Sequence, residues 1–313
     1  MKFGLQHPSF SFDGKGVEIA DSLKQLVLRA ESSGFDSFWV MDHFHQIRFV
    51  GASNEPMLEG WTTIAALSGV TSKIRLGTLV TGNTYRHPSV LAKIGATLDI
   101  MSKGRLFMGI GAGWNEEEAN AYGIPFPPTK ERLKRLEEAV QIIKKMWTEE
   151  SANFNGKYYK LQSAYCNPKP IQKPHPPIMV GGEGERETLR IVAKYADACN
   201  LFGSPNTVKH KLEVLREHCK TAGRDYNEIL KTKLGRVVIG KSKSEVERQL
   251  AESFEEAPPE RIKEMAIYGT PEDVRREIEA LRDVGIEYLI VNLGAKQESE
   301  AVSVFADEVI KRF

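Results

Sequence analysis

Hydrophobic residues occur along this chain in two alternating patterns. Short apolar runs, typical of buried strands, alternate with longer segments in which apolar residues recur every three or four positions, as on one face of a helix. This alternation indicates a parallel sheet whose strands are connected by helices. The apolar runs predict eight strands, at residues 3–7, 35–41, 74–80, 105–111, 177–182, 197–202, 231–240 and 288–294.

The helical pattern is clearest in the middle of the chain and near its end. Leu133, Leu136, Val140, Ile143 and Trp147 recur at helical spacing and form one apolar stripe. The segment Thr-Pro-Glu-Asp at 270–273 predicts a helix start. Thr270 can cap the helix, Pro271 is tolerated in the first turn because its missing N–H costs nothing there, and Asp273 can complete a capping box.

Eight strand–helix units predict a TIM (β/α)8 barrel, since an open doubly wound sheet usually has about five or six strands. We expect a single domain spanning residues 1–313, with two insertions in the barrel. The Pro-rich segment 151–176 is predicted to be irregular or a small hairpin, and the charged segment from about 241 to 268 is predicted to be helical. Chemistry is then expected where strands end and loops begin, on one face of the barrel.

Composition narrows the class of protein. The chain has 43 Lys and Arg against 42 Asp and Glu. It therefore lacks the excess of positive charge by which many proteins attract nucleic acid. It also lacks an apolar run of about eighteen residues that could cross a membrane. The start of the chain has no long apolar core, so we expect a cytoplasmic protein. The three cysteines have no metal or disulfide spacing, so we expect neither a disulfide framework nor a thiolate-metal centre.

Histidines follow the second predicted strand, beside an acid, in the run Asp42-His43-Phe44-His45. A His-x-His pair at a strand end can hold a divalent metal, which suggests a metal-dependent hydrolase. That site needs further ligands, and His7 is the only obvious supplement, so we predict no metal. Two other interpretations remain open: in one, Asp42 holds a structural His, and in the other, it sets the tautomer of a proton-transferring His.

Glycines follow the fourth and fifth predicted strands. Gly111 and Gly113 resemble part of a dinucleotide fingerprint, but the final glycine and the later acid are missing, so we reject a nicotinamide site. Bare backbone there allows a flat ligand to approach closely, or simply allows a tight turn. Gly181-Gly182-Glu183-Gly184 precedes a predicted helix, and its backbone N–H groups could hold a phosphate.

Three consecutive acids, residues 116–118, follow the fourth predicted strand. One of them could be the acid of a glycosidase, but that chemistry needs a partner carboxylate at another strand end. The end of the seventh predicted strand supplies none. We therefore predict that these acids form a solvated helix start.

Several of these segments resemble the luciferase-like monooxygenase family, and the resemblance covers most of the chain. The strongest are FDSFWVMDHF, MLEGWTTIAALSGVTSKIRLGTLVTGNTYRHPSVLAK, GRLFMGIGAGWNEEEANAYGIPFPP, ERLKRLEEAVQIIKKMWTEE and PIMVGG. The resemblance implies a TIM barrel that uses a reduced flavin, FMN, or the deazaflavin coenzyme F420. The Asp-His pair that ends the second strand is similar to that of the deazaflavin-using class.

The resemblance also implies roles for individual residues. His43 would manage a proton during hydride transfer, and the bond Leu79–Val80 would be a non-proline cis peptide in a bulge behind the ring. Trp114 stands where some sugar-oxidising members have Glu, which suggests an aromatic wall for an apolar or planar substrate. The other implied cofactor contacts are Asp42, Thr81, Asn83, Gly111, Gly113, Asn115, Gly181, Gly182, Glu183 and Gly184, and the substrate pocket would include His7, His45 and Trp114.

The prediction is an oxidoreductase that transfers a hydride between coenzyme F420 and a small organic substrate. One alternative is an FMNH2-dependent monooxygenase of the same family. A second is a non-catalytic protein that binds or stores the flavin or deazaflavin. The family resemblance further implies a homodimer.

Overall fold

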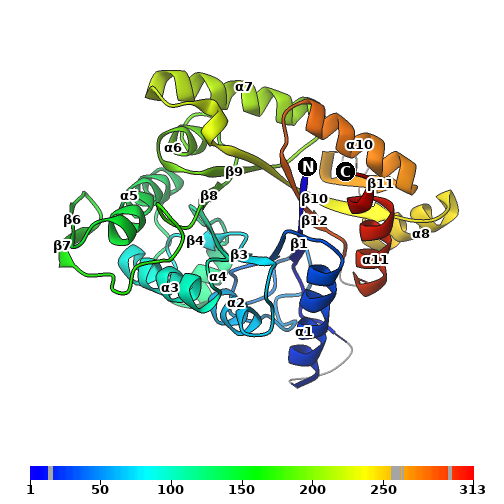
Figure 1. Ribbon diagram of the computed structural model, residues 1–313, viewed down its shortest axis with the longest axis horizontal. Coiled ribbons are helices and arrows are strands. Elements are labelled where there is room, and N and C mark those ends of the chain that lie inside the picture. Colours follow the sequence, from blue (N-terminus) through cyan, green and yellow to red (C-terminus); the bar gives the residue numbers. More distant parts are fainter. Residues whose placement is uncertain (13–16, 255–261, 263, 295–297) are drawn as a thin grey trace.

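The computed structural model describes residues 1–12, 17–254, 262, 264–294 and 298–313. Eight parallel strands form a closed barrel, which confirms the predicted TIM fold (Figure 1). Their order around the barrel is β10-β12-β1-β2-β3-β5-β8-β9, and pairing of β9 with β10 closes the ring. The bounds are β1 (Lys2–His7), β2 (Ser37–Val40), β3 (Arg75–Thr78), β5 (Leu106–Gly111), β8 (Ile178–Gly181), β9 (Ala198–Leu201), β10 (Leu230–Ile239) and β12 (Tyr288–Asn292).

Helices cover the outside of the barrel (Figure 1). They are α1 (Val17–Ser32), α2 (Gly60–Ser68), α3 (Pro88–Met101), α4 (Glu116–Ala121), α5 (Thr129–Thr148), α6 (Thr188–Tyr195), α7 (Pro205–Ala222), α8 (Lys243–Ser253), α10 (Pro271–Asp283) and α11 (Glu298–Glu308). Short 3-10 turns occupy Tyr226–Glu228 and Ile310–Arg312. The apolar stripe predicted around 133–147 lies in α5, and Thr270 and Asp273 form the predicted capping box of α10.

Two hydrophobic cores result from the alternation of side chains along each strand. The larger core lies between strands and helices and includes Phe38 and Val40 of β2. Trp39, between them in sequence, points into the barrel. The inner core is made by Trp39, Leu79, Phe107, Met179, Ala198, Tyr288 and Ile290. This core fills the barrel, so a ligand site is expected at its mouth rather than through its middle.

The two predicted insertions lie at opposite ends of the molecule (Figure 1). Within 151–176, strands β6 (Ala152–Asn155) and β7 (Lys160–Ala164) form an antiparallel hairpin. Within 241–268, α8 is helical as predicted, but the segment ends in strand β11 (Ala266–Gly269), so the expected helix is wrong there. β10 extends beyond its pairing with β9, and β11 pairs in parallel with the free part of that edge. Residues 255–261 and 263 of this expected insertion lie outside the described residues.

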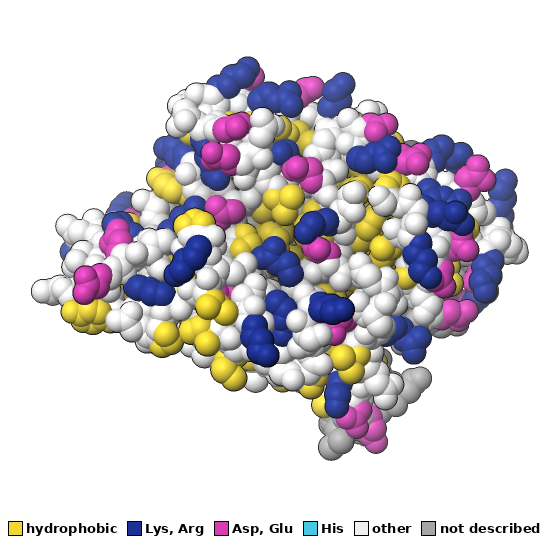
Figure 2. Space-filling view, in the orientation of Figure 1, with side chains coloured by type: hydrophobic (Ala, Val, Ile, Leu, Met, Phe, Trp, Pro, Cys, Tyr) yellow, Lys and Arg dark blue, Asp and Glu magenta, His cyan; other side chains and the backbone are white. Residues whose placement is uncertain are grey.

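The face shown in Figure 2 carries Lys and Arg side chains interspersed with Asp and Glu, with hydrophobic patches between them. This mixture agrees with the near balance of the formal charges. Among the described residues, no helix is both long and apolar enough to cross a membrane.

Candidate active site at the barrel mouth

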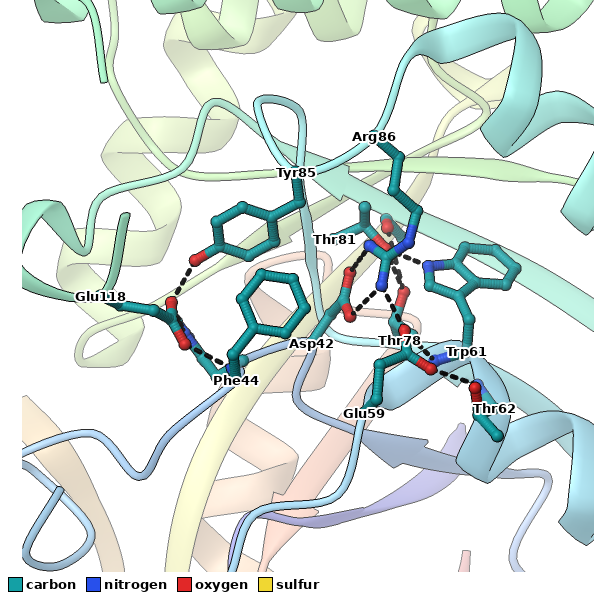
Figure 3. A network of polar contacts seen from close by, with 12 residues as sticks. Asp42, Phe44, Glu59, Trp61, Thr62, Thr78, Thr81, Tyr85, Arg86 and Glu118 are labelled. Atoms are coloured by element: carbon teal, nitrogen blue, oxygen red, sulfur yellow. Dashed lines mark hydrogen bonds and ion pairs between the residues drawn. The ribbon is translucent and has the colours of Figure 1, made fainter. Parts of the chain in front are cut away.

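Asp42 follows β2 at the carboxyl end of the barrel and is buried. Both of its oxygens accept hydrogen bonds from Arg86, at 2.6 and 3.0 Å, and Arg86 also binds Glu59 (Figure 3). Burial raises the pKa of Asp42, although the charge and hydrogen bonds of Arg86 oppose this shift. Asp42 therefore pairs with Arg86, and this placement does not support the expectation that Asp42 sets the tautomer of His43.

The partner of His43 is Glu118, which lies in α4. Nδ1 of His43 is 2.8 Å from a carboxylate oxygen of Glu118, and the exposed fractions of the two residues are 8% and 0%. The same carboxylate accepts hydrogen bonds from the Tyr85 hydroxyl and from the backbone N–H of Phe44 and His45 (Figure 3). Our expectation that residues 116–118 form a solvated helix start is thus wrong for Glu118, although its two acidic neighbours are exposed.

The geometry around Glu118 determines its charge. Burial opposes ionisation, but hydrogen bonds from His43, Tyr85 and Phe44 outweigh burial and lower the pKa of Glu118. Burial, together with the neighbouring Glu118 carboxylate, raises the pKa of Tyr85, so Tyr85 remains a hydrogen-bond donor. An ionised carboxylate can only accept, so the Nδ1 atom of His43 carries a proton. In neutral His43, Nε2 is then the atom with a free lone pair.

The loop after β3 forms a wall of the mouth opposite β10. The peptide bond between Leu79 and Val80 is cis, as the family resemblance implied. Val80 lies over the glycines of two neighbouring strands: a Cβ atom on Gly111 would lie 2.9 Å from Val80 Cγ2, and one on Gly181 would lie 2.9 Å from Val80 Cγ1. These glycines therefore make room for Val80, and they act on the site through that side chain.

Buried polar atoms beside this wall have no protein partner. Among the described residues, neither the amide nitrogen of Asn83 nor the hydroxyl of Thr84 has a hydrogen-bond partner. A Cβ atom on Gly113, whose φ is +77°, would lie 3.5 Å from that hydroxyl. Because buried polar groups are normally paired, these atoms fit a polar ligand such as the ring of a flavin or deazaflavin. Thr84 was not singled out by its sequence pattern.

Other predicted cofactor residues have structural partners. The Thr81 hydroxyl accepts a hydrogen bond from Trp61 Nε1 at 2.8 Å and lies 2.8 Å from the Thr78 hydroxyl (Figure 3). Asn115 caps α4 by accepting a hydrogen bond from the backbone N–H of Glu118. That cap places Glu118 in the first turn of α4, pointing toward His43.

The loop Gly181-Gly182-Glu183-Gly184 connects β8 to α6, and Gly182 has a φ of +109°. Glu183 accepts a hydrogen bond from the backbone N–H of Phe202 at 3.3 Å. The nearby Arg190 is already bound by Glu137 and Glu187. Phosphate binding at this loop would thus rely on backbone N–H groups, and it stays a prediction.

The three histidines of the metal hypothesis do not converge. His7 packs against the rings of Phe10, Phe12 and Phe38. Phe38 belongs to the larger core, between the strands and the helices, so this placement does not support the expectation that His7 faces the substrate. The Nδ1 atom of His45 is 3.1 Å from the backbone oxygen of Gln46, while His43 binds Glu118.

A cavity of about 850 Å³ opens on the other half of the mouth, which we call the β10–β12 pocket. It is lined by residues of β1, β10, β12, α8, α11 and nearby loops, among them Gln6, Arg236 and Asn292. In the order of strands, β10, β12 and β1 lie opposite β3, β5 and β8, which carry the Val80 wall. Phe49 lines this pocket and contacts Trp114, whose ring meets His43 edge-on with centroids 5.6 Å apart. Trp114, which is 49% exposed, thus contacts both His43 and a residue that lines the pocket.

The sequence pattern pointed to Asn292, which follows the apolar run of the last predicted strand, but not to Gln6 or Arg236. Gln6 and Arg236 lie in strands that hold other polar residues, such as Lys2 in β1 and Lys233 in β10, so the pattern does not distinguish them. The signal available for them was a position near the carboxyl end of a strand, where the closed barrel gathers its site.

Comparisons with known proteins agree with this architecture. The sequence profile of the luciferase-like monooxygenase family matches residues 1–257. An F420-dependent glucose-6-phosphate dehydrogenase of Kineococcus radiotolerans is 29% identical over 319 residues, covering 92% of this chain and 91% of that protein.

Two solved structures show the same fold. An F420-dependent tetrahydromethanopterin reductase from Methanopyrus kandleri superposes with a TM-score of 0.81 at 22% identity, covering 100% of this chain and 99% of that one. The oxygenating constituent of 3,6-diketocamphane monooxygenase from Pseudomonas putida, in complex with FMN, superposes with a TM-score of 0.78 at 21% identity over 100% and 99% of the chains. The profile match spans most of this chain, and the chain belongs to the luciferase-like monooxygenase family.

Proposed function

We propose that this protein is an oxidoreductase that transfers a hydride between coenzyme F420 and a small organic substrate. The observation that carries the proposal is the buried contact between His43 and Glu118, beside a wall whose buried polar atoms find no partner in the described part of the chain. The relative of similar length described as F420-dependent supports the choice of cofactor.

The residues of the mouth have complementary roles in this proposal. When bound, the deazaflavin supplies the carbon that gives or takes the hydride. His43 holds or moves the accompanying proton at Nε2, because Glu118 keeps its Nδ1 protonated. Val80 would support the ring, Asn83 and Thr84 would offer it hydrogen bonds, and Trp114 would border the substrate.

The backbone of residues 181–184 would hold the phosphate of the cofactor. Three side chains predicted as cofactor contacts would act indirectly: Asp42 through Arg86, Thr81 through Trp61, and Asn115 through Glu118. His45 would support the His43 segment through its backbone bond to Glu118.

Cofactor binding tests the proposal directly. The purified protein is titrated separately with coenzyme F420 and with FMN, and the fluorescence of each ring is followed. We expect F420 to bind more tightly than FMN. Tight binding of FMN with no binding of F420 would instead support a flavin monooxygenase.

The role of His43 is tested in the same system with a panel of organic substrates. His43→Ala should keep F420 binding and lower turnover by about a hundredfold, the usual contribution of one acid–base group. Unchanged turnover would remove His43 from the mechanism. Binding of F420 without turnover of any substrate by the wild-type protein would favour a non-catalytic binding protein.

We also propose that the chain acts as a single-domain, cytoplasmic homodimer. Pairing of β1 with β12, which lie near opposite ends of the sequence, supports a single domain. The three cysteines are free and buried, as is usual in a reducing compartment.

Val90 and Met101 are exposed on one face of α3 and could meet a second copy. Light scattering should give twice the chain mass, and Met101→Glu should reduce it to that of one chain.

A further inference from the structure

Arg236 occupies an unusual position in the β10–β12 pocket. It lies on β10, next to Asn292 of β12, and its guanidinium stacks on the ring of Phe254 at 4.7 Å. Among the described residues, no carboxylate pairs with Arg236. Burial lowers the pKa of Arg236, as expected for a guanidinium that is withdrawn from water without a compensating acid.

Three other charged residues of the pocket, all on α8, have partners on that helix or next to it. Arg248 and Glu252 of α8 form an ion pair at 3.2 Å. Glu245, also on α8, accepts hydrogen bonds from the backbone of Lys241 and from Gln249. These acids are on the helix, whereas Arg236 is on the barrel strand. An anion that enters the pocket would thus meet Arg236 at the strand level.

Two amides lie at the same level as Arg236. Asn292 Nδ2 donates to the side-chain oxygen of Gln6 at 3.3 Å, which joins β12 to β1. Among the described residues, the side-chain nitrogen of Gln6 donates to no acceptor, so it is open to a ligand in the pocket that Gln6 lines. The free amide N–H of Gln6 and the guanidinium of Arg236 lie on the strands on either side of β12, and together they match the two oxygens of a carboxylate.

Apolar side chains form much of the remaining wall. Met41, Ile47 and Phe49 approach from the segment after β2, and Leu234 and Val238 from β10. A sugar phosphate would bring many hydroxyl groups against these side chains, whereas the hydrocarbon part of an organic acid would bury apolar surface there. The wall therefore favours an anion with an apolar body.

We propose that the β10–β12 pocket binds the substrate as an amphipathic organic carboxylate, whose charged group contacts Arg236 and whose apolar body lies toward Trp114 and His43. The role of this ligand as substrate rests on the proposed function, but its binding does not. The two ideas can therefore fail separately.

The test compares octanoate, the neutral 1-octanol and glucose 6-phosphate as probes. Binding to the full chain is measured by calorimetry, with and without added F420. We expect octanoate to bind more tightly than the other two. Arg236→Met should weaken octanoate binding by about 10- to 100-fold, the effect of losing a charge-assisted hydrogen bond, and should leave octanol binding unchanged.

Arg216→Met is the matched control, because Arg216 also stacks on an aromatic ring, that of Tyr226 at 4.7 Å, but does not line the pocket. This control should bind octanoate as the wild type does. Arg236→Lys retains the charge and should lose less affinity than Arg236→Met. Unchanged octanol binding shows that each variant has folded.

The proposal is overturned if octanoate and octanol bind equally well, or if Arg236→Met leaves octanoate binding intact. Preferential binding of glucose 6-phosphate through Arg236 would also overturn the choice of an apolar acid. Arg236-dependent octanoate binding by a protein that does not bind F420 would support the pocket and reject the proposed function.

Discussion

At the scale of residues, the site depends on which acid contacts which base. Asp42 precedes His43 in sequence but binds Arg86, whereas Glu118, 75 residues from His43, binds its Nδ1 atom. Adjacent residues at a strand end point in different directions, so sequence proximity is a poor guide to side-chain contact. The distant carboxylate is the one that determines the tautomer.

We expect Glu118→Gln to lower kcat by about 10- to 100-fold while KM changes little. Glutamine offers Nδ1 a neutral amide that can either donate or accept, so the tautomer of His43 is no longer fixed and Nε2 is less often free to move the proton. Steady-state kinetics measure kcat and KM. Glu117→Gln, an exposed neighbour on the same helix, is the control and should behave as the wild type does.

Tyr85→Phe separates a chemical role of Glu118 from a structural one. This variant removes the hydroxyl that binds Glu118 but leaves the contact between His43 and Glu118 in place. The kcat of Tyr85→Phe should then stay near that of the wild type. An equal loss of kcat in Tyr85→Phe and Glu118→Gln would contradict a specific role for the contact with His43.

Thr84→Val should stabilise the protein and weaken cofactor binding. The Thr84 hydroxyl is buried without a partner among the described residues, so its removal should raise the free energy of unfolding by about 1 kcal/mol. Loss of a hydrogen bond to the ring should lower F420 affinity severalfold. Urea unfolding and fluorescence titration measure the two effects, with the exposed Thr97→Val as control. A loss of stability would show that the hydroxyl has a partner in the protein.

At the scale of elements, glycines on two strands allow a third element to shape the site. Gly111 ends β5 and Gly181 ends β8, and the Val80 side chain occupies the space above both. The alternation of apolar residues predicted these strands, but it could not show that Val80 lies across them. The role of each glycine is therefore to accept a neighbouring side chain.

Gly181→Ala should lower the free energy of unfolding by about 1–3 kcal/mol, because its Cβ would lie 2.9 Å from both methyl groups of Val80. It should also weaken F420 binding by displacing the Val80 wall. Val80→Ala in the same chain removes those methyl groups and should recover most of the lost stability. Urea unfolding of both single variants and the double variant measures this coupling.

Gly69→Ala is a suitable control, because the added Cβ would lie at an ordinary 3.5 Å from its nearest neighbour. If Gly181→Ala and Gly69→Ala were equally stable, overcrowding by Val80 would be refuted.

At the scale of the whole molecule, ionised carboxylates tie separate elements together. Glu118 of α4 binds the segment after β2, and Glu137 of α5 binds Arg190 of α6. Hydrogen bonds from Arg190 lower the pKa of Glu137, and hydrogen bonds from His43 and Tyr85 lower that of Glu118 despite burial. A carboxylate with a lowered pKa in the folded state stabilises that state when ionised.

The contribution of these two carboxylates to the free energy of unfolding should therefore be complete above about pH 4.5, the ordinary pKa of glutamate. It should be lost as the pH falls through their lowered pKa values in the folded state. The raised pKa of Asp42 acts in the opposite direction and offsets part of this loss. Urea unfolding between pH 3 and 7 measures the dependence. Glu137→Gln should show a smaller loss, and an unchanged loss would exclude Glu137 as a contributor.

The sequence by itself determined the barrel, because the spacing of apolar residues is a local property that reports which face of each strand or helix is buried. It also determined the capping box at Thr270, since both partners lie within one turn. Only the tertiary structure decided that Glu118 contacts His43 and that Arg236 enters a pocket with Gln6 and Asn292. Those contacts join segments far apart in the chain, and they exist because closing the barrel brings the carboxyl ends of its strands together.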